Sequence, residues 1–480
     1  MDIFNIAANT ETSTFNTPPN TPFSFSISIL KASDRAYIFN VEDTPSKKKF
    51  EYVFNKDHQS YLDFFEKLAK QFNMRVPQNR QNKSFKTTFK ATYKEVLTQN
   101  LTSEILYGYG DPSVIRVDRN QLIEYFLLAT SNDAPNAFPI LRSNNLVEWE
   151  FVDFVFPKGK KPKWAADGEL VSDFWAPEMH FIENEFRVYF VAREKNSREL
   201  CIGMARSEHP AGPFVAEKEP ILKGNVIDPH IFVADNHTSY LFWKEDNNDI
   251  WPGCLLDLLY AQPKLISTLF KNQQDQSSVC FILSIWPWAK NLEPMERFQA
   301  IQVLIEAVTS QFMEFYDSVS TLLKNENDNE DLRAVLKFMK TPMYAQQLTE
   351  DGTKLIGERV KILENDLKWE AHLVEGMWVT KHLNKYYLFY AGNDFSTEHY
   401  GIGVAIADSP LGPYTKMPKQ LLQSTAEWRA PGHPSVTIAP DGKTVMLLHA
   451  YFPGKAGYKE FRALLAINLI FEENGVRIES

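Results

Sequence analysis

Apolar and polar residues alternate with a period of two from Phe23 to Ile29, which is the pattern of a half-buried strand. Residues 36–41 and 50–54 resemble it and predict further strands. Large apolar side chains then recur at spacings of three and four, which places them on one face of a helix. They are Tyr61, Phe64, Phe65, Leu68 and Phe72. We therefore predict a small α+β unit over residues 23–98.

The residues before Phe23 do not continue this pattern. They are mostly polar, and Pro18, Pro19 and Pro22 lie close together. A segment with little apolar surface recovers too little free energy on burial to offset the entropy lost on ordering. We therefore predict a disordered lead-in over residues 1–22.

Beyond residue 105 the chain repeats one unit, an Asp-containing turn with an aromatic-rich strand. The strands of this unit fall at residues 122–130, 186–192, 239–244, 386–391 and 444–450. Segments 201–214 and 401–414 are also identical at six of fourteen positions. Repeated strand-and-turn units are typical of a propeller, in which each small sheet buries its faces against its neighbours. We predict a mainly β fold, a five-bladed β-propeller over residues 99–480.

One stretch, residues 254–340, interrupts this repeat. Its apolar side chains recur at helical spacing, as in the series Ile301, Leu304, Ile305, Val308 and Phe312. Strand-like sequence resumes at residues 343–348. We therefore predict a helical insertion in the third blade. Nothing in the sequence identifies a protein partner for this insertion or for the unit at 23–98.

Composition and charge narrow the function classes. Hydrophobic residues make up 44% and charged residues 23% of the chain, and no apolar run reaches the roughly 18 residues that would suggest a membrane span. The formal net charge of -10 argues against nucleic acid as a partner, because nucleic acid binds clustered Lys and Arg. Three cysteines are too few for a disulfide framework. The N-terminus lacks the features of a secretory signal, so we expect a cytoplasmic protein.

Three short segments each place a carboxylate at the start of a predicted strand. They are residues 109–114 with Asp111, residues 226–232 with Asp228, and residues 374–378 with Glu375. A carboxylate beside Pro or Gly is often only a turn former. Here one falls in each of three blades, whose inner strands would converge on one axis. Inverting glycoside hydrolysis needs such a set, with a base and an acid about 6.5–9.5 Å apart and room for water between them. A third acid can keep the proton donor's pKa high by charge repulsion.

In the order and content of these motifs, the chain resembles glycoside hydrolase family 43 over residues 105–253 and 341–475. The resemblance implies an inverting hydrolase of the α-L-arabinofuranosidase or β-xylosidase type, whose substrate is a pentose-containing carbohydrate. It implies that Asp111 is the general base and Glu375 the general acid. It also implies that Asp228 tunes the pKa of that acid.

The predicted general-acid motif departs from the family pattern. Glu375-Gly376 is followed by Met377, where the family usually has Pro. This difference puts the local turn in question and makes Glu370 a nearby competitor for the role of acid.

The same resemblance implies a set of substrate contacts. Residues 174–178 are similar to a motif whose Trp borders the sugar pocket. The implied contacts are Ile140, Phe174, Trp175, His230 and Arg462. Residue type alone leaves other roles open, because a Trp is more often part of a core and an Arg often forms a surface ion pair.

No cofactor is implied as a requirement, but a structural metal is an open alternative. Residues 431–435 resemble a segment whose His, here His433, helps to hold a water-ligated calcium ion near the propeller axis. Calcium prefers about six to eight oxygen ligands, and no oxygen-rich loop of that kind occurs in the sequence. A hydrogen-bonded core histidine is the other interpretation of His433.

Two other functions stay open. A retaining five-bladed enzyme that acts on fructosides would use an Asp nucleophile, but its opening motif is normally Asn-Asp-Pro-Asn-Gly, whereas residues 110–114 are Gly-Asp-Pro-Ser-Val. A propeller without catalysis could instead bind glycans or proteins. Signatures of other enzyme classes, such as a Gly-x-Ser-x-Gly elbow or a His-Glu-x-x-His zinc helix, do not occur.

Overall fold

The computed structural model describes residues 12–34, 36–55, 57–80, 85–119, 122–248, 250–325, 329–473 and 475–479. The chain divides into two compact units. The first comprises Met1–Lys83 and Asn247–Met339, and the second comprises Ser84–Asp246 and Lys340–Ser480. Within the described ranges, no helix has the length and apolar character needed to cross a membrane.

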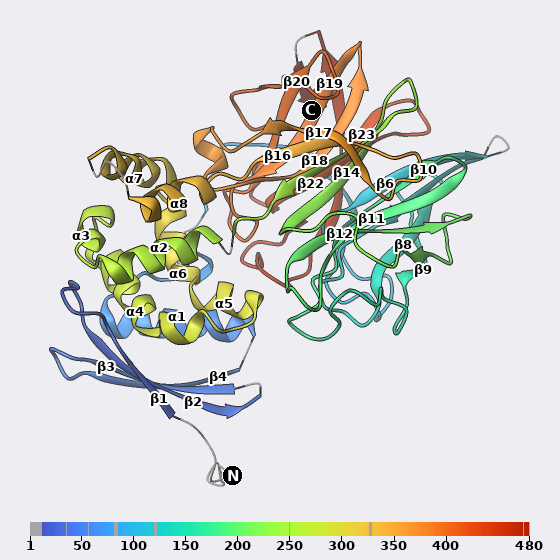
Figure 1. The fold of residues 1–480 in the computed structure, drawn as a ribbon. Coiled ribbons are helices and arrows are strands. Elements are labelled where there is room, and N and C mark those ends of the chain that lie inside the picture. Colours follow the sequence, from blue (N-terminus) through green and yellow to red (C-terminus); the bar gives the residue numbers. More distant parts are fainter. Residues whose placement is uncertain are drawn as a thin grey trace. The chain divides into compact units, whose positions relative to one another are not determined.

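The first unit contains a four-stranded antiparallel sheet whose strands follow chain order (Figure 1). They are β1 (Thr12–Asn16), β2 (Phe25–Ser33), β3 (Ala36–Asp43) and β4 (Lys49–Asn55). Alternate side chains of β2 and β3 are buried, as their period-two pattern predicts. Helix α1 (His58–Phe72) packs against this buried face, with the ring of Phe64 centred 5.0 Å from that of Phe39.

The prediction of a disordered lead-in is wrong for residues 12–22. Strand β1 pairs with β2, from Thr12 opposite Leu30 to Asn16 opposite Ser26. Just beyond β1, the buried hydroxyl of Thr17 lies 2.7 Å from that of Ser284. An edge strand gains backbone hydrogen bonds from its neighbour even when few of its side chains are buried, so a polar sequence can form one. Residues 1–11 of the predicted lead-in lie outside the described residues.

The predicted insertion is helical. Its described helices are α2 (Ile250–Ala261), α3 (Leu265–Leu269), α4 (Gln273–Ala289), α5 (Pro294–Ala300), α6 (Gln302–Thr309), α7 (Phe312–Asn325) and α8 (Glu330–Phe338). Helix α4 packs against β1 and β2, with the ring of Phe281 centred 6.1 Å from that of Phe25 (Figure 1). The insertion and the N-terminal segment therefore form one unit, not the two that we predicted, because their apolar faces cover one another.

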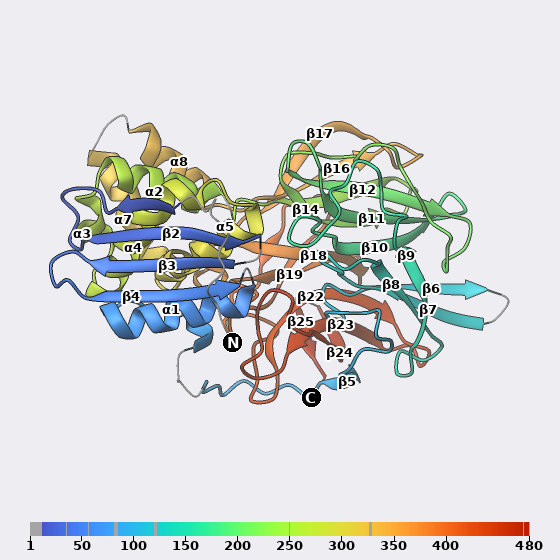
Figure 2. The same ribbon diagram turned by 90° about the horizontal axis from the view of Figure 1, so that it is seen from below.

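The second unit consists of five antiparallel sheets (Figure 2). The first is β6 (Ser113–Arg119), β7 (Leu122–Leu128), β8 (Ala137–Ser143) and β9 (Glu150–Phe156). The second is β10 (Trp175–Ile182), β11 (Glu185–Arg193), β12 (Leu200–Ser207) and β13 (Val215–Ala216). The third is β14 (Val226–Val233), β15 (Ser239–Glu245), β16 (Met343–Leu348) and β17 (Leu355–Leu363). The fourth is β18 (Val374–His382), β19 (Lys385–Gly392), β20 (Gly401–Ala407) and β21 (Thr415–Lys416). The fifth is β22 (Arg429–Ile438), β23 (Thr444–Tyr451), β24 (Ala463–Glu472) and β25 (Gly475–Ile478).

These five sheets form a closed ring. The first strand of each sheet contacts the first strand of the next, and β22 contacts β6 in turn. Apolar side chains fill the spaces between neighbouring sheets. The predicted mainly β fold is confirmed. The helical insertion is confirmed in the third sheet, because α2–α8 lie between β15 and β16 in the chain.

The internal repeat of the sequence forms equivalent strands, β12 and β20, the third strands of their sheets. Gly203 and Gly403 hold matching positions in them. A Cβ atom on Gly203 would lie 2.6 Å from the ring of Phe190, and one on Gly403 would lie 2.7 Å from the ring of Tyr390. Glycine is required at both positions because an aromatic ring of the neighbouring strand packs directly on the backbone.

A further strand, β5 (Lys94–Leu97), belongs to the ring as well, so the predicted boundary at residue 98 is wrong. It pairs with residues 464–466 of β24. Strand β25 covers only residues 469–472 of β24, which leaves the backbone at 464–466 free to bind β5. Residues 85–97 are therefore part of the second unit.

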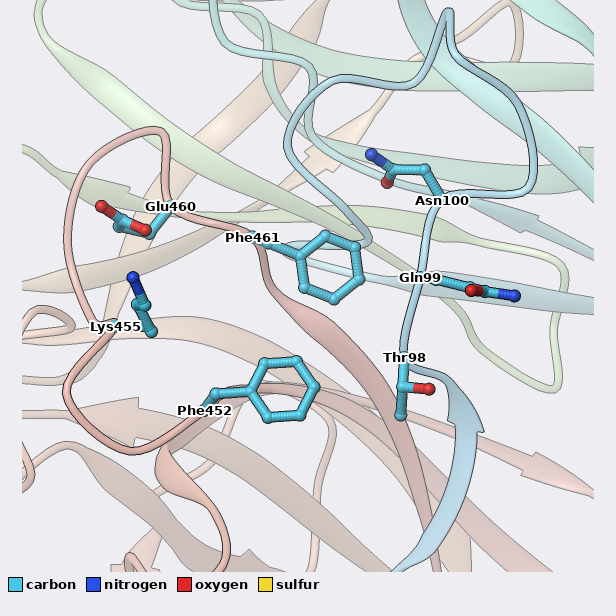
Figure 3. A pocket seen from close by; sticks show the side chains of 7 residues that line it. All are labelled: Thr98, Gln99, Asn100, Phe452, Lys455, Glu460 and Phe461. Atoms are coloured by element: carbon cyan, nitrogen blue, oxygen red, sulfur yellow. The ribbon is translucent and has the colours of Figure 1, made fainter.

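The residues that follow β5 line a pocket of about 480 Å³ together with the loop between β23 and β24 (Figure 3). Its walls are Thr98, Gln99, Asn100, Phe452, Lys455, Glu460 and Phe461. Tyr109 fixes the first of these two segments. Its hydroxyl donates to the carbonyl of Gln99 at 3.1 Å and accepts from the amide of Leu101 at 2.8 Å.

Candidate active site

The first strands of four sheets share a local irregularity. The pairing register shifts within β10, β14, β18 and β22, and each shift lies beside a residue with positive φ. These residues are Ala176, Asp228, Gly376 and His433. A β-bulge bends its strand and redirects side chains, which is why bulges are common beside active sites. Asp111, two residues before β6, also has a positive φ of 50°. The three predicted carboxyls thus lie at such a residue or, for Glu375, directly before one.

Asp111 is held by neighbours from three directions. Arg462 donates from Nη1 to its Oδ1 at 2.8 Å, and the hydroxyl of Thr130 donates to its Oδ2 at 2.5 Å. The Asp111 amide donates to Nδ1 of His449 at 3.0 Å. Nδ1 of His433 lies 3.5 Å from Asp111 Oδ1. The carboxylate is therefore fixed in one orientation, with 15% of its side chain exposed.

The surroundings of Asp111 keep it ionised. Burial by itself would raise its pKa, but the guanidinium of Arg462, then the two neighbouring histidines, and the hydroxyl of Thr130 lower it. The net result is a pKa well below the usual range of an aspartate. The carboxylate is therefore ionised and oriented, as a general base must be before it can accept a proton, while the lowered pKa also makes it a weaker base.

Glu375 has the opposite character. Lys244 donates to its Oε2 at 3.2 Å, and the hydroxyl of Tyr400 donates to its Oε1 at 2.8 Å. Burial raises the pKa of Glu375, the charge of Lys244 lowers it, and the charge of Asp228 raises it again. The net pKa lies above the usual range, which suits a group that must hold a proton and then donate it.

Asp228 connects the other two carboxyls. Its Oδ2 accepts a hydrogen bond from the amide of Gly376, the residue after Glu375, at 2.7 Å. Burial raises the pKa of Asp228 to about 7 against the opposing charge of Lys244, and the charge of Asp111 adds to the rise. The structure therefore brings all three predicted carboxyls into one electrostatic unit, in which the charge of Asp111 raises the pKa of Asp228 and the charge of Asp228 raises that of Glu375.

Lys244 belongs to this site although the sequence analysis did not single it out. Its side chain is fully buried, and its Nζ lies 3.2 Å from Glu375 Oε2 and 3.3 Å from Asp246 Oδ1. A buried cation needs such partners, because burial of an unpaired charge is very costly. A signal was present in the sequence, since a lysine directly after Leu241, Phe242 and Trp243 stands in an otherwise apolar strand.

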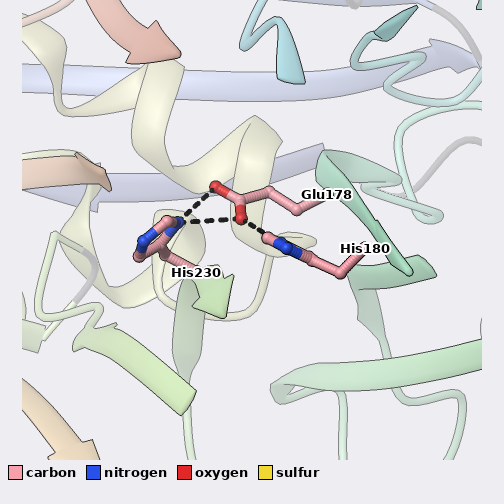
Figure 4. A group of neighbouring side chains, drawn as sticks. All are labelled: Glu178, His180 and His230. Atoms are coloured by element: carbon pink, nitrogen blue, oxygen red, sulfur yellow. Dashed lines mark hydrogen bonds and ion pairs between the residues drawn. The ribbon is translucent and has the colours of Figure 1, made fainter. Parts of the chain in front are cut away.

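Glu178, His180 and His230 form a hydrogen-bonded chain beside the strand that carries Glu375 (Figure 4). Glu178 Oε2 lies 2.8 Å from His180 Nε2 and 2.9 Å from His230 Nδ1. The amide of Val379, in β18, donates to His230 Nε2 at 2.9 Å. Burial lowers the pKa of His230 to about 3, so its imidazole is neutral. Since both ring nitrogens are engaged by the protein, His230 positions β18 and has no free nitrogen for a sugar hydroxyl.

Within the described ranges, these same three side chains form the group with metal-ligand composition and spacing. The contact to Val379 argues against a metal there. A neutral imidazole that accepts a hydrogen bond at Nε2 carries its proton on Nδ1. The nitrogen that faces Glu178 and His180 therefore has no lone pair to offer a metal ion.

His433, the predicted metal ligand, is not part of that group. It lies against Asp111 and against the backbone of Gly376, where a Cβ atom would come 2.9 Å from its Nδ1. Asp111 is the one carboxylate recorded in ion-pair range of His433 among the described residues. By themselves, His433 and Asp111 offer fewer ligands than the about six to eight that calcium prefers, so a calcium ion here would depend on water for the rest. The water-ligated calcium ion at His433 stays a prediction.

Besides His230, two of the predicted substrate contacts are wrong. Phe174 and Ile140 have no exposed surface and lie in the apolar core between the first and second sheets. A side chain without exposed surface cannot contact a sugar. Trp175, in contrast, is half-buried at the start of β10, and its Nε1 donates to Asn132 Oδ1 at 3.0 Å. A contact between Trp175 and substrate stays a prediction.

Glu370, the alternative acid, is committed to the protein interior. Its fully buried side chain accepts hydrogen bonds from the hydroxyl of Tyr390 at 2.7 Å and from the amides of Asp366 and Leu367, each at 2.8 Å. Lys416 donates to it as well, also at 2.8 Å. With both oxygens occupied and no exposed surface, Glu370 cannot reach a leaving group. The geometry favours Glu375, whose side chain is 13% exposed.

Comparisons with known proteins agree with these observations. The sequence profile of glycosyl hydrolases family 43 matches residues 105–263 and 326–476. Over 81 residues the chain is 36% identical to xylosidase/arabinosidase 43A of Humicola insolens, a stretch that covers 17% of this chain and 23% of that protein. Over 301 residues it is 22% identical to a xylosidase/arabinosidase of Bacteroides ovatus, with 63% of this chain and 71% of that protein covered.

Solved structures extend the comparison to the fold. The crystal structure of a thermostable family-43 glycoside hydrolase superposes with a TM-score of 0.54 at 24% sequence identity. The match covers 78% of this chain and 93% of that one. The chain spans about a quarter of the length of the first curated relatives that it matches. The likeness to the solved structure therefore supports the propeller-type fold. The match to each of these first curated relatives covers only part of that relative's sequence.

Proposed function

Because the chain belongs to glycosyl hydrolase family 43, we propose that it is an inverting hydrolase of pentose-containing glycans, of the α-L-arabinofuranosidase or β-xylosidase type. The observation that carries this proposal is the electrostatic contrast between Asp111 and Glu375, two acids of one site with pKa values shifted in opposite directions. When the environments of two carboxyl groups shift their pKa values apart, one group can act as the acid and the other as the base. The names of the relatives from Humicola insolens and Bacteroides ovatus support the substrate class.

In this proposal Asp111 acts on water. Its carboxylate takes one proton from a water molecule, whose oxygen then forms a bond to the anomeric carbon from the face opposite the leaving group. Arg462 and Thr130 hold the two oxygens of Asp111, so the carboxylate is oriented before the substrate arrives. This preorganisation lowers the entropic cost of the attack.

Glu375 acts on the leaving group. As the bond between the anomeric carbon and the glycosidic oxygen breaks, the Glu375 proton passes to that oxygen, and Glu375 becomes a carboxylate. The ammonium of Lys244 and the hydroxyl of Tyr400 are placed to stabilise this new charge. Asp228 raises the pKa of Glu375 by its negative charge, and its hydrogen bond from Gly376 holds the backbone of the acid in place.

A hydrolysis screen tests the proposal. The purified protein is assayed on aryl α-L-arabinofuranoside, aryl β-D-xyloside and linear arabinan, with Glu375→Ala as the matched control. We expect turnover of at least one pentoside that is lost in the variant. Absence of turnover on every substrate would move the assignment to a glycan-binding propeller.

Proton NMR of the first-formed sugar tests the stereochemistry separately. An inverting enzyme releases the anomer opposite to that of the substrate, because water attacks directly. Release of the same anomer would instead point to a covalent intermediate on an Asp nucleophile, as in the fructoside-acting alternative.

A further inference from the structure

The pocket between residues 98–100 and the loop joining β23 to β24 combines two aromatic rings with polar side chains. Figure 3 shows Phe452 and Phe461 one above the other, with Gln99 and Asn100 to one side and Lys455 and Glu460 to the other. None of the three predicted catalytic carboxyls is among its lining residues. It is therefore a separate feature of the ring.

The stacked rings of Phe452 and Phe461 give the pocket an apolar side. Their centroids lie 6.2 Å apart, and their planes differ by 22°. Phe452 also packs on Trp428, at 4.9 Å between centroids, so a second aromatic ring supports its position. Even so, 37% of Phe452 is exposed.

The polar groups of the pocket suit a neutral ligand that is rich in hydroxyls. Two amide side chains, Gln99 and Asn100, offer both donors and acceptors, and the charges of Lys455 and Glu460 cancel.

The volume and chemistry together indicate a class of ligand. A volume of about 480 Å³ lies within the usual range of small-molecule sites, about 300–1,000 Å³. Pentose rings present C–H groups on their faces and hydroxyls at their edges, which matches an aromatic wall flanked by amides and opposite charges. We propose that this pocket is a second carbohydrate site, which binds a short pentose segment of the polysaccharide outside the catalytic centre. The identity of the sugar rests on the proposed function.

The pocket is connected to the catalytic centre on both sides. Phe461 precedes Arg462, whose guanidinium holds Asp111 at 2.8 Å. The segment of Gln99 is fixed by the hydroxyl of Tyr109, two residues before Asp111. A glycan chain bound here is thus held on the same structural elements that position the base, so the pocket would raise the local concentration of polymer at the enzyme.

Phe452→Ala tests the proposal, with Phe181→Ala as the matched control. Phe181 is an exposed phenylalanine of β10, 52% exposed, and does not line the pocket. Rates are measured on an aryl pentoside and, at low concentration, on arabinan and xylan. For Phe452→Ala we expect unchanged kcat/KM on the aryl pentoside and a loss of about three- to tenfold on the polymer, the size expected for one aromatic contact. Equal polymer rates in wild type, Phe181→Ala and Phe452→Ala would overturn the proposal.

A binding measurement separates this proposal from the proposed function. Arabinotetraose and xylotetraose are titrated by NMR or calorimetry into Asp111→Asn and into the Asp111→Asn/Phe452→Ala double variant. We expect two binding events in the first protein and the loss of one of them in the second. If wild type fails to hydrolyse pentosides while this difference persists, the catalytic proposal fails and the second site stands. If both proteins bind identically, the second site fails whatever the activity.

Discussion

On the two sides of the candidate site, the surroundings shift the pKa of a carboxyl group in opposite directions. Beside β6, Asp111 faces Arg462 and a hydroxyl, and its pKa is held below the usual range. Beside β14 and β18, Asp228 and Glu375 are buried close to one another, and their pKa values rise despite the single cation of Lys244. The difference lies in the number of carboxylates that share a cation: Arg462 pairs with Asp111, whereas Lys244 is shared by Asp228, Glu375 and Asp246. This asymmetry is the physical basis for assigning the base to Asp111 and the acid to Glu375.

The largest expected effect comes from the removal of the charge of Asp111. Asp111→Asn keeps the size of the side chain but cannot accept a proton from water, so kcat should fall by about 10²–10⁴-fold, the usual contribution of a general base. Thermal unfolding checks that the fold is retained. A variant with wild-type kcat would contradict the role of Asp111.

Changing the cation on each side should move a different limb of the pH profile. Arg462→Gln removes the charge that lowers the pKa of Asp111, so that pKa rises and activity on the acidic side is lost at a higher pH than in wild type. Arg462→Lys, which keeps the charge, is the control. The measurement is kcat/KM against pH. If the acidic limb does not move in Arg462→Gln, Arg462 does not set the pKa of the base.

The corresponding change on the other side is Lys244→Met. Lys244 lowers the pKa of Glu375, so its removal should raise that pKa and shift the basic limb, where the acid loses its proton, to higher pH. We also expect kcat to fall, because the carboxylate that forms during proton transfer loses its cation. If the basic limb moved to lower pH, Lys244 would not act on the acid as the contact at 3.2 Å implies.

A smaller effect is expected from the chain of Glu178 and His230. Glu178→Gln keeps the volume but weakens the orientation of His230, whose Nε2 accepts from the Val379 amide in the strand of Glu375. The expected result is a fall in kcat of about tenfold, the order found for partners that orient a catalytic group, with KM and the pH limbs unchanged. A large rise in KM with unchanged kcat would indicate direct substrate contact by this chain.

The smallest effect on catalysis is expected in the core that lies between the first two sheets. Ile140→Val removes one buried methylene and should cost about 0.5–1.5 kcal/mol of unfolding free energy. Because Ile140 has no exposed surface, kcat/KM should not change. Denaturant unfolding measures the unfolding free energy, and a parallel assay measures kcat/KM. A changed KM with an unchanged unfolding free energy would indicate that Ile140 contacts the substrate after all.

Local patterns in the sequence predicted much of the molecule. Period-two alternation located β2, and the short segments around Asp111, Asp228 and Glu375 identified carboxyls that the ring brings together. The polar sequence of residues 12–16 does not predict strand β1, because an edge strand gains backbone hydrogen bonds without needing apolar side chains.

Local sequence patterns could not predict the contacts between residues that lie far apart in the sequence. Lys244 and Glu375 are 131 residues apart, with helices α2–α8 of the insertion between them, and Arg462 is 351 residues from Asp111. Such pairs form only when the ring closes. Ile140 and Phe174 were misassigned for the same reason, since the sequence does not show which side of a strand faces the neighbouring sheet.

The dependence of the rate on the leaving group tests the division of roles most directly. Glu375→Gln and Asp111→Asn are compared on a dinitrophenyl pentoside, whose leaving oxygen needs no proton, and on an unactivated pentose disaccharide, whose leaving oxygen does. If Glu375 is the acid and Asp111 the base, Glu375→Gln keeps most of its kcat/KM on the activated substrate and loses it on the disaccharide, whereas Asp111→Asn loses activity on both. Equal losses by Glu375→Gln on the two substrates, or sparing of the activated substrate by Asp111→Asn, would contradict the account.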